Sequence, residues 1–449
     1  MKNDGIDIHE MTFITQDKFD SLNSGKFKEG DILYCLRGSL GKYAVVQKDL
    51  KGVIASSLVI LRAYENSFID YISLFLQSNF AKKQIKIYDN GTAQPNLSSA
   101  DLRKFLVPMP SKEERSQIVE KVDELMQLCD QLEQQQTLSS DAHATLVDTL
   151  LKAVTESSDT DEFQANWQRI VANFDVLFTT EYSIEQLKQT VLQLAVMGKL
   201  VKQDPSDEPA SELLKKIADE KAKLIKEGKI KKSKPLPEIS EGEKPFELPE
   251  DACWVRLEEL IPSFQNGNSS RGDKDGVEIA VLRLADITNN RIDLSDLRYL
   301  VIDENSIARY QLIKNDILIT RVNGSTDIVG SFTYCADDIK AIYCDHFIRM
   351  RLNQLWIDSE YLSTIGRSRL IRSQIESLFI TTAGQKTVNQ KHIGSILVPL
   401  FTKNQQIKIV QKVNQLFSMI EQLQVLQSKL QKTKLHLADA LVANAVEGV

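Results

Sequence analysis

Long apolar runs are missing from this chain of 449 residues. No stretch approaches the roughly 18 consecutive apolar residues of a membrane-spanning helix. The opening residues, MKNDGIDIHEMTF, have neither the basic head nor the apolar run of a signal peptide. The sequence therefore predicts a cytoplasmic protein that does not contact a membrane.

Cysteine and histidine are scarce, with five of each. The cysteines are widely spaced and include no C-x-x-C pair, which argues against a disulfide framework or a zinc site. The histidines lack metal-ligand spacing. We therefore expect no metal, and we expect reduced core residues at Cys35, Cys129, Cys253, Cys335 and Cys344.

Recurrent catalytic motifs are absent as well. The chain has no G-x-x-x-x-G-K-[ST] phosphate loop, no G-x-G-x-x-G turn, no G-x-S-x-G elbow, no H-E-x-x-H pair and no N-P-P-[YF] tetrapeptide. These absences oppose a nuclease or methyltransferase in one chain. The net charge of -7 opposes a protein that coats DNA unaided, but it leaves a local basic face open.

An internal repeat is present. TTAGQKTVNQKHIGSILVPL at 381–400 resembles NGTAQPNLSSADLRKFLVPM at 90–109, and Val398 lies 291 residues after Val107, as Pro399 does after Pro108. This period is far above the roughly 20–50 residues of solenoid repeats, so it indicates duplicated domains. We expect two similar halves and a pseudo-twofold internal repeat.

A helix-start signal follows each repeat. Ser111-Lys-Glu-Glu114 and Thr402-Lys-Asn-Gln405 have the spacing of capping boxes. Apolar residues then alternate at intervals of four and three, which is typical of a coiled-coil seam. We expect the two seams to bury each other, whereas the alternative is that each helix packs on its own domain. The seam residues are Ile118, Val122, Leu125, Leu132, Ile409, Val413, Leu416 and Leu423.

Between the halves, Ser183-Ile-Glu-Gln186 predicts another capped helix start, and Gly198 suits a position just past a helix end. From 203 to 250 the composition predicts a charged helix followed by a linker. Residues 252–400 mix strand-like runs with helical patterning around 359–378, which predicts an α+β domain. Asp31 of GDIL aligns with Asp316 of NDIL, but fewer residues precede Asp31, so we expect a shortened first domain.

Donor-rich loops beside the repeats are candidate DNA-binding sites. Arg and Asn side chains pair with base edges, and Gly and Ser offer donors to phosphate. The same residue types are also typical of ordinary turns. Arg283, Arg349 and Arg351 are weaker candidates, because alternating arginines often face solvent. The candidates are Arg321, Asn323, Gly324, Ser325, Gln385, Lys386 and Thr387, with Arg37, Ser39, Gln94 and Asn96 in the first half.

Together, GDIL and NDIL, RVNGS, TTAGQKTVNQKHI and the LVP junctions resemble the specificity subunit of type I restriction–modification enzymes. QLAVMGKLVKQDPSDEPASELLKKI is similar to the central conserved region of one branch of that family. The resemblance implies two target recognition domains separated by long antiparallel coiled-coil helices. Each domain would read one half of a split sequence in double-stranded DNA, and the helices would set the spacer.

The resemblance also implies partners. Two methyltransferase subunits would dock on the helices and supply adenine N6-methylation with S-adenosylmethionine, and motor-nuclease subunits would use ATP and Mg²⁺. No cofactor is expected in this chain itself. The expected parts are a first recognition domain at 1–110, a central conserved helical region at 111–202, a charged helix and linker at 203–250, a second recognition domain at 251–400 and a C-terminal spacer helix at 401–449. The alternative is a coiled-coil scaffold that binds protein without DNA selectivity.

Overall fold

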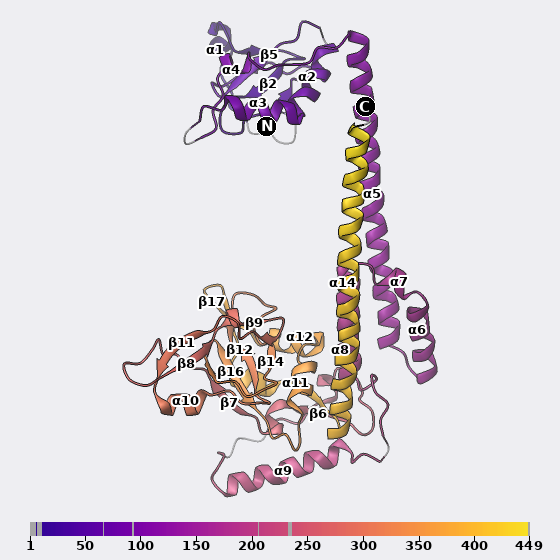
Figure 1. The fold of residues 1–449 in the computed structure, drawn as a ribbon, viewed down its shortest axis with the longest axis vertical. Helices are drawn as coiled ribbons and strands as arrows, with labels where there is room; N and C mark the ends of the chain where they lie inside the picture. Colours follow the sequence, from indigo (N-terminus) through magenta and orange to yellow (C-terminus); the bar gives the residue numbers. More distant parts are fainter. Residues whose placement is uncertain are drawn as a thin grey trace. The chain divides into compact units, whose positions relative to one another are not determined.

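A computed structural model describes residues 6, 11–65, 67–91, 94–204, 206–231 and 236–447 (Figure 1). The chain forms two compact units, residues 1–140 and 141–449, and each is described by itself. In the described part, no helix is both long enough and apolar enough to cross a bilayer.

The first unit is built on an antiparallel sheet of order β3-β2-β5, with β1 and β4 paired beside it. Its core contains Tyr34, Phe75 and Leu97, all buried. The strands are β1 (Lys26–Phe27), β2 (Ile32–Cys35), β3 (Tyr43–Val45), β4 (Gly52–Val53) and β5 (Leu58–Leu61). The helices are α1 (Gln16–Ser21), α2 (Ser67–Gln77), α3 (Asn79–Tyr88), α4 (Ser99–Leu102) and the long α5 (Lys112–Thr155), which continues into the second unit.

The start of α5 is fixed by its cap and by one arginine. The Ser111 hydroxyl accepts from the Glu114 amide at 3.2 Å, so the predicted helix start is correct. One turn later, Nη1 of the buried Arg115 donates to the Pro110 carbonyl at 2.9 Å. Its guanidinium lies 3.9 Å from the centre of the Phe68 ring, which ties α5 to α2.

The helical part of the second unit centres on α8 (Glu181–Val196), which packs against α14 (Lys403–Glu447). The predicted start at Ser183 is wrong. The helix begins three residues earlier because Thr180 accepts from the Ser183 amide at 3.1 Å, while the Ser183 hydroxyl accepts from the Thr180 amide at 3.2 Å. The other helices here are α6 (Thr160–Ala172), α7 (Phe174–Leu177) and α9 (Ala210–Lys226), the last lying in the charged stretch.

Gly198 lies just past the end of α8, at the C′ position, as the sequence predicts. Its φ of +72° is left-handed, the Gly198 amide donates to the Ala195 carbonyl at 3.2 Å, and the Lys199 amide donates to the Leu194 carbonyl at 3.0 Å. These paired bonds form a Schellman motif. A Cβ on Gly198 would lie 2.6 Å from the Phe401 ring, so both backbone angle and space require glycine.

The strands of the second unit form small sheets: β14-β12-β16-β7, β11-β8-β15, β13-β18-β17, β19-β6 and β10-β9. All pair antiparallel except β15 with β8. The strands are β6 (Cys253–Arg256), β7 (Ser263–Asn266), β8 (Val277–Leu282), β9 (Ile287–Thr288), β10 (Arg291–Ile292), β11 (Arg298–Ile302), β12 (Ile317–Thr320), β13 (Val322–Asn323), β14 (Phe332–Tyr334), β15 (Ala341–Tyr343), β16 (Phe347–Arg351), β17 (Ile380–Thr382), β18 (Gln385–Thr387) and β19 (Leu397–Leu400). Shorter helices join them: α10 (Glu304–Tyr310), α11 (Ser359–Ile365), α12 (Arg369–Ser377), α13 (Gln390–Ser395), and the 3-10 turns η1 (Glu241–Glu243), η2 (Leu257–Leu260) and η3 (Leu284–Asp286).

One ion pair, between a buried aspartate and a partly exposed arginine, occurs in both units. In the first unit, Arg62 donates from Nε and Nη2 to the two Asp31 oxygens at 2.7 and 2.6 Å. In the second, Arg351 donates from the same atoms to Asp316 at 2.6 and 2.7 Å. Each aspartate precedes the central strand, β2 or β12, and each arginine lies at the end of the neighbouring strand or just beyond it.

Two further contacts also recur. Tyr71 on α2 donates its hydroxyl hydrogen to the Pro108 carbonyl at 2.8 Å, and Tyr361 on α11 donates to the Pro399 carbonyl at 2.8 Å. The amide groups of Gln84 and Gln374 each bond both backbone groups of one residue, respectively Leu106 and Leu397. The two prolines belong to the repeated Val-Pro junctions, so the same helix-to-junction contacts are built twice.

Three arginines that were expected to face solvent are held by contacts within the second unit. Arg351 does not face solvent freely, because it binds Asp316, and Arg349 is only 7% exposed and donates to the Arg309 carbonyl at 3.2 Å. Arg283 is likewise held, in an ion pair with Asp286 at 2.8 Å.

Among the cysteines, Cys335 is buried, Cys35, Cys253 and Cys344 are half-buried, and Cys129 is exposed on α5, so the core prediction is wrong for Cys129.

Candidate nucleic-acid interface

Two of the predicted loop clusters meet in the sheet β13-β18-β17. Asn323 lies opposite Lys386, and Val322 opposite Thr387. The hairpin between β17 and β18 turns at Ala383 and Gly384, whose φ values are both positive, +49° and +79°. Positive φ at both central residues is typical of a type I′ turn, whose twist suits a tight hairpin. The RVNGS and GQKT segments are therefore neighbours, although 58 residues lie between Ser325 and Gly384 in the sequence.

Several polar side chains of this sheet already form hydrogen bonds within the chain. The Asn323 side-chain oxygen accepts from the Ser325 amide at 2.9 Å, and Lys386 Nζ donates to the Gly324 carbonyl at 3.2 Å. The Thr387 hydroxyl donates to the Ile380 carbonyl at 3.0 Å. Gln385 is exposed at the hairpin tip, and Asn323 is half-buried. These amides are the best-placed groups for an external partner.

Arg321 lies at the base of this sheet. Its amide donates to the His346 carbonyl at 2.7 Å, its carbonyl accepts from the Val388 amide at 3.0 Å, and its Nη1 reaches the Asp345 carbonyl at 3.4 Å. The backbone is thus fixed on both sides. Within the described residues, the bond from Nη1 is the one hydrogen bond of this guanidinium, whose five N–H groups can serve further acceptors.

The first-unit candidates also gather in one loop cluster. Arg37 pairs with Asn96 as an isolated bridge, the Gly38 amide donates to the Pro95 carbonyl at 3.0 Å, and the Ser39 amide donates to the Arg37 carbonyl at 3.1 Å. Gln94 is exposed beside them. Because Arg37 lies opposite Asn96 as Val322 lies opposite Thr387, Arg37 takes the place of Val322 and not of Arg321.

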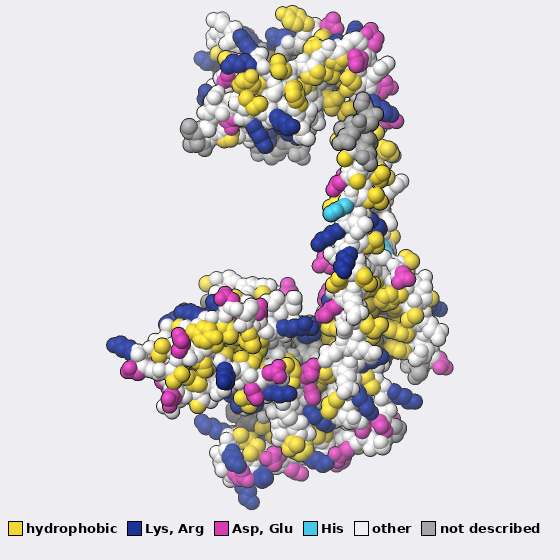
Figure 2. All heavy atoms as spheres, viewed as in Figure 1, with side chains coloured by type: hydrophobic (Ala, Val, Ile, Leu, Met, Phe, Trp, Pro, Cys, Tyr) yellow, Lys and Arg dark blue, Asp and Glu magenta, His cyan; other side chains and the backbone are white. Residues whose placement is uncertain are grey.

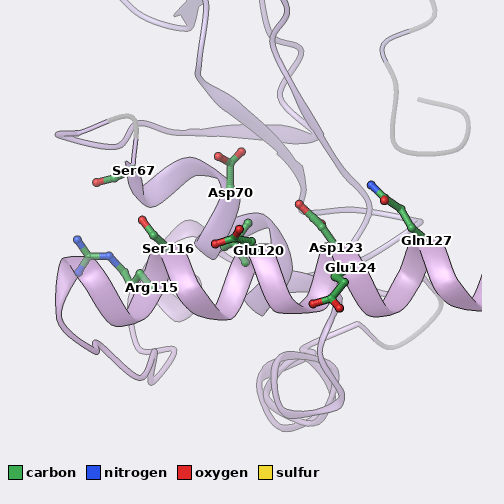
Figure 3. A pocket seen from close by; sticks show the side chains of 9 residues that line it. Ser67, Asp70, Arg115, Ser116, Glu120, Asp123, Glu124 and Gln127 are labelled. Atoms are coloured by element: carbon green, nitrogen blue, oxygen red, sulfur yellow. The ribbon is translucent and has the colours of Figure 1, made fainter.

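A cavity of about 480 Å³ in the first unit lies between α2 and α5. Figure 3 shows Asp70 on α2 and Glu120 and Asp123 on α5 at this cavity, and Glu124 also lines it. Among the described residues of the lining, the one cation is Arg115, which is already bound to Pro110 and Phe68. Four carboxylates repel phosphate, so this cavity does not suit DNA.

The seam residues have two different environments. On α5, Ile118 and Val122 are half-buried, while Leu125 and Leu132 are 49% and 56% exposed. On α14, Ile409 and Val413 are buried, and Leu416 and Leu423 pack at the edge of the core that also contains Leu187 and Val191 of α8. The α14 seam therefore has a partner, α8, that the sequence did not predict.

Sequence reasoning also missed a cavity in the second unit, lined by the loop 268–271, by η3 and by Cys344, Asp345 and His346. The usable signals were the polar run NGNSSRG and the tripeptide Cys-Asp-His. On the face shown in Figure 2, basic and acidic side chains of this unit are interspersed and form no basic patch.

The polar hairpin β17-β18 and the strand β13 therefore bring the predicted RVNGS and GQKT residues together on the α+β core of the second unit. Residues 2–139 match the sequence family described as type I restriction modification DNA specificity domain. The chain is 36% identical to the EcoAI type I restriction enzyme specificity subunit of Escherichia coli, covering 94% of this chain and 72% of the relative. It is 35% identical to the EcoEI specificity subunit of Escherichia coli, covering 94% and 73%.

The chain belongs to the family of type I restriction enzyme specificity subunits, as its identity to the EcoAI subunit over most of both chains shows. Among solved structures, the HsdS subunit from Thermoanaerobacter tengcongensis is 16% identical with a TM-score of 0.41, over 91% of this chain and 79% of that one.

Proposed function

We propose that this chain gives a type I restriction–modification enzyme its DNA sequence specificity and is itself non-catalytic. Family membership supports this role. The observation that carries it at the site is the sheet in which the Asn323–Ser325 turn and the Gln385–Thr387 strand lie side by side. Amide side chains can bond an adenine edge at two points, so Gln385 and Asn323 are the proposed base readers.

The duplicated contacts support two target recognition domains, one in each unit, each reading one half of a split DNA sequence. The Asp–Arg pair and the Tyr–Pro contact hold the same elements together in both units. The long helices α5 and α14 would form the antiparallel spacer between the domains. Exposed leucines along α14, at Leu430, Leu437 and Leu441, are suited to dock the two methyltransferase subunits. Those subunits would bind S-adenosylmethionine, and the motor-nuclease subunits would bind ATP and Mg²⁺.

The test is to co-express the chain with its methyltransferase subunit in a host without DNA methylation. Modified adenines are then mapped by single-molecule sequencing. The expected result is one split motif with methylated adenines in both halves. The host with the methyltransferase subunit alone is the control.

Methylation without a sequence motif, or a methyltransferase that methylates the same motif without this chain, would contradict the proposal. A chain that binds the methyltransferase subunit but never imposes a motif would instead be a coiled-coil scaffold. A specificity subunit and a scaffold would both bind through the exposed leucines of α14, so the presence of a methylated sequence motif is the result that distinguishes the two hypotheses.

A further inference from the structure

The cavity that the sequence missed is a formed pocket of about 280 Å³ in the second unit. Its walls come from the loop 268–271, the end of β8 with η3, the strand β11 and the turn 344–346. Val281 and Leu300 provide an apolar floor. The pocket is too small for most drug-sized ligands, which occupy roughly 300–1,000 Å³.

Cations dominate the lining. Its charged residues in the described part of the chain are Arg271, Arg283, Arg298, His346 and one carboxylate, Asp345. Arg283 is fixed by Asp286 and by the Asp296 carbonyl, at 2.8 and 2.6 Å. Arg271 and Arg298 are exposed, and neither forms an ion pair with any carboxylate in the described part of the chain. Two guanidiniums are therefore available to an anion.

The loop 268–271, which forms one wall of the pocket, is held in place by hydrogen bonds within the chain. The Asn268 amide donates to the Tyr343 carbonyl at 2.9 Å, and the Asn268 side chain accepts from the Ser270 amide at 2.7 Å. A Cβ on Gly267 would lie 1.9 Å from the Cys344 carbonyl oxygen, so only glycine permits this approach. Such preorganisation lowers the entropy cost of binding.

The turn 344–346 is shared with the candidate interface. The His346 carbonyl accepts from the Arg321 amide at 2.7 Å, and the Asp345 carbonyl accepts from Arg321 Nη1 at 3.4 Å. A group held in the pocket therefore lies next to the segment that leads into Asn323. In the first unit, the Leu36 amide makes the corresponding bond to the Ser57 carbonyl at 2.8 Å, and Ser57 belongs to an uncharged turn, Ala55–Ser57.

A metal ion is the competing occupant. Cys344 Sγ lies 3.7 Å from His346 Nδ1, which lies 3.2 Å from Asp345 Oδ1, and the three ligand atoms are within 4.8 Å of one another. These separations fit a zinc ion. However, burial raises the pKa of the Cys344 thiol, and the three arginines of the same cavity repel a cation. The charge of the pocket favours an anion.

We propose that this pocket binds a phosphodiester of the DNA backbone, with Arg271 and Arg298 on the phosphate and the apolar floor under the deoxyribose. The inference rests on the proposed function. The pocket would fix the register of the second recognition domain while the neighbouring hairpin reads bases, since phosphate contacts position a protein and base contacts specify the sequence.

The test uses the full chain assembled with its methyltransferase subunits. Arg271→Gln, Arg298→Gln and the double variant are compared with Arg169→Gln, a matched loss of charge on α6 outside the pocket. Affinity for the duplex defined by methylation mapping, and for a scrambled duplex, is measured by fluorescence anisotropy across a salt series. We expect the double variant to lose about tenfold on both duplexes, and the slope of log affinity against log salt to fall by about 0.9.

An unchanged salt slope relative to Arg169→Gln would overturn the inference. A loss confined to the mapped duplex would also overturn it, because it would make these arginines base readers. If the wild-type complex shows no preference for the mapped duplex, the proposed function fails. A reduced slope in the double variant would in that case still support a phosphate pocket. Circular dichroism of each variant verifies folding.

Discussion

Asp316 is fully buried, and its carboxylate accepts two bonds from Arg351 and one, at 3.0 Å, from the Ile313 amide. Replacing it by Asn keeps the shape but removes the charge opposite Arg351. Breaking a buried pair is strongly destabilising, and Arg351 is partly open to water, so we expect Asp316→Asn to cost about 3 kcal/mol of unfolding free energy. Urea denaturation measures this loss. Asp337→Asn, on the exposed surface, is the control, and equal losses would show that the pair adds no stability.

The equivalent pair in the first unit responds to acid. Burial raises the pKa of the Asp31 carboxyl, but the Arg62 guanidinium and the Lys28 amide outweigh burial and hold that pKa below its ordinary value of 3.8. Because the folded-state pKa is the lower one, its stabilisation is present above about pH 4 and is lost as pH falls through the folded-state pKa. The stability difference between wild type and Asp31→Asn should therefore shrink between pH 5 and pH 3, roughly. A constant difference would contradict this.

At the scale of elements, α14 has a buried half and a solvated half. Ile409 is fully buried against the α8 core, whereas Leu437 is 61% exposed. We expect Ile409→Ala to lower the unfolding free energy by about 2–4 kcal/mol, because it leaves a cavity. Leu437→Ala should change it by less than about 0.5 kcal/mol. Thermal or urea unfolding of both variants checks this, and a comparable loss for Leu437→Ala would show that its side chain is packed in the folded chain.

The element scale also shows where sequence reasoning succeeds. Ser111, Thr402 and Gly198 were readable because a cap is decided by bonds within one helical turn. The start of α8 was misplaced because two polar residues three positions apart, Thr180 and Ser183, both fit a cap. The sequence did not show that α8 covers the α14 seam. An apolar stripe on a helix indicates that the helix packs against another element, but it does not specify which one.

At the scale of the whole molecule, the two units have separate hydrophobic cores, one around Tyr34 and Phe75 and the other around Leu187 and Ile409. We therefore expect two calorimetric unfolding transitions, with the larger enthalpy for residues 141–449 because enthalpy scales with size. Asp31→Asn should lower only the smaller transition and Asp316→Asn only the larger one. A single transition shifted by both variants would contradict independent unfolding.

The internal repeat made one part of the fold predictable from the sequence, but it did not predict the pocket. The matching segments GDIL and NDIL predicted that Asp31 and Asp316 are equivalent, because local strand and turn chemistry is copied with the sequence. The segments NGNSSRG and Cys-Asp-His are visible in the sequence, but the pocket they form was missed because nothing in the sequence shows that the two segments meet at Gly267.

The last prediction concerns the division of labour between the units. Gln385 and Gln94 are the exposed amides of equivalent loops, so Gln385→Ala and Gln94→Ala form a matched pair. If each unit reads one half of the target, each variant should relax a different half of the methylated motif. A lost bidentate base contact is worth about 1–3 kcal/mol, which is roughly 5- to 150-fold in preference at one base pair. Single-molecule sequencing of methylated adenines reads both halves at once. Relaxation of the same half by both variants would show that a single unit reads the DNA, because loops with separate targets cannot affect the same base pairs.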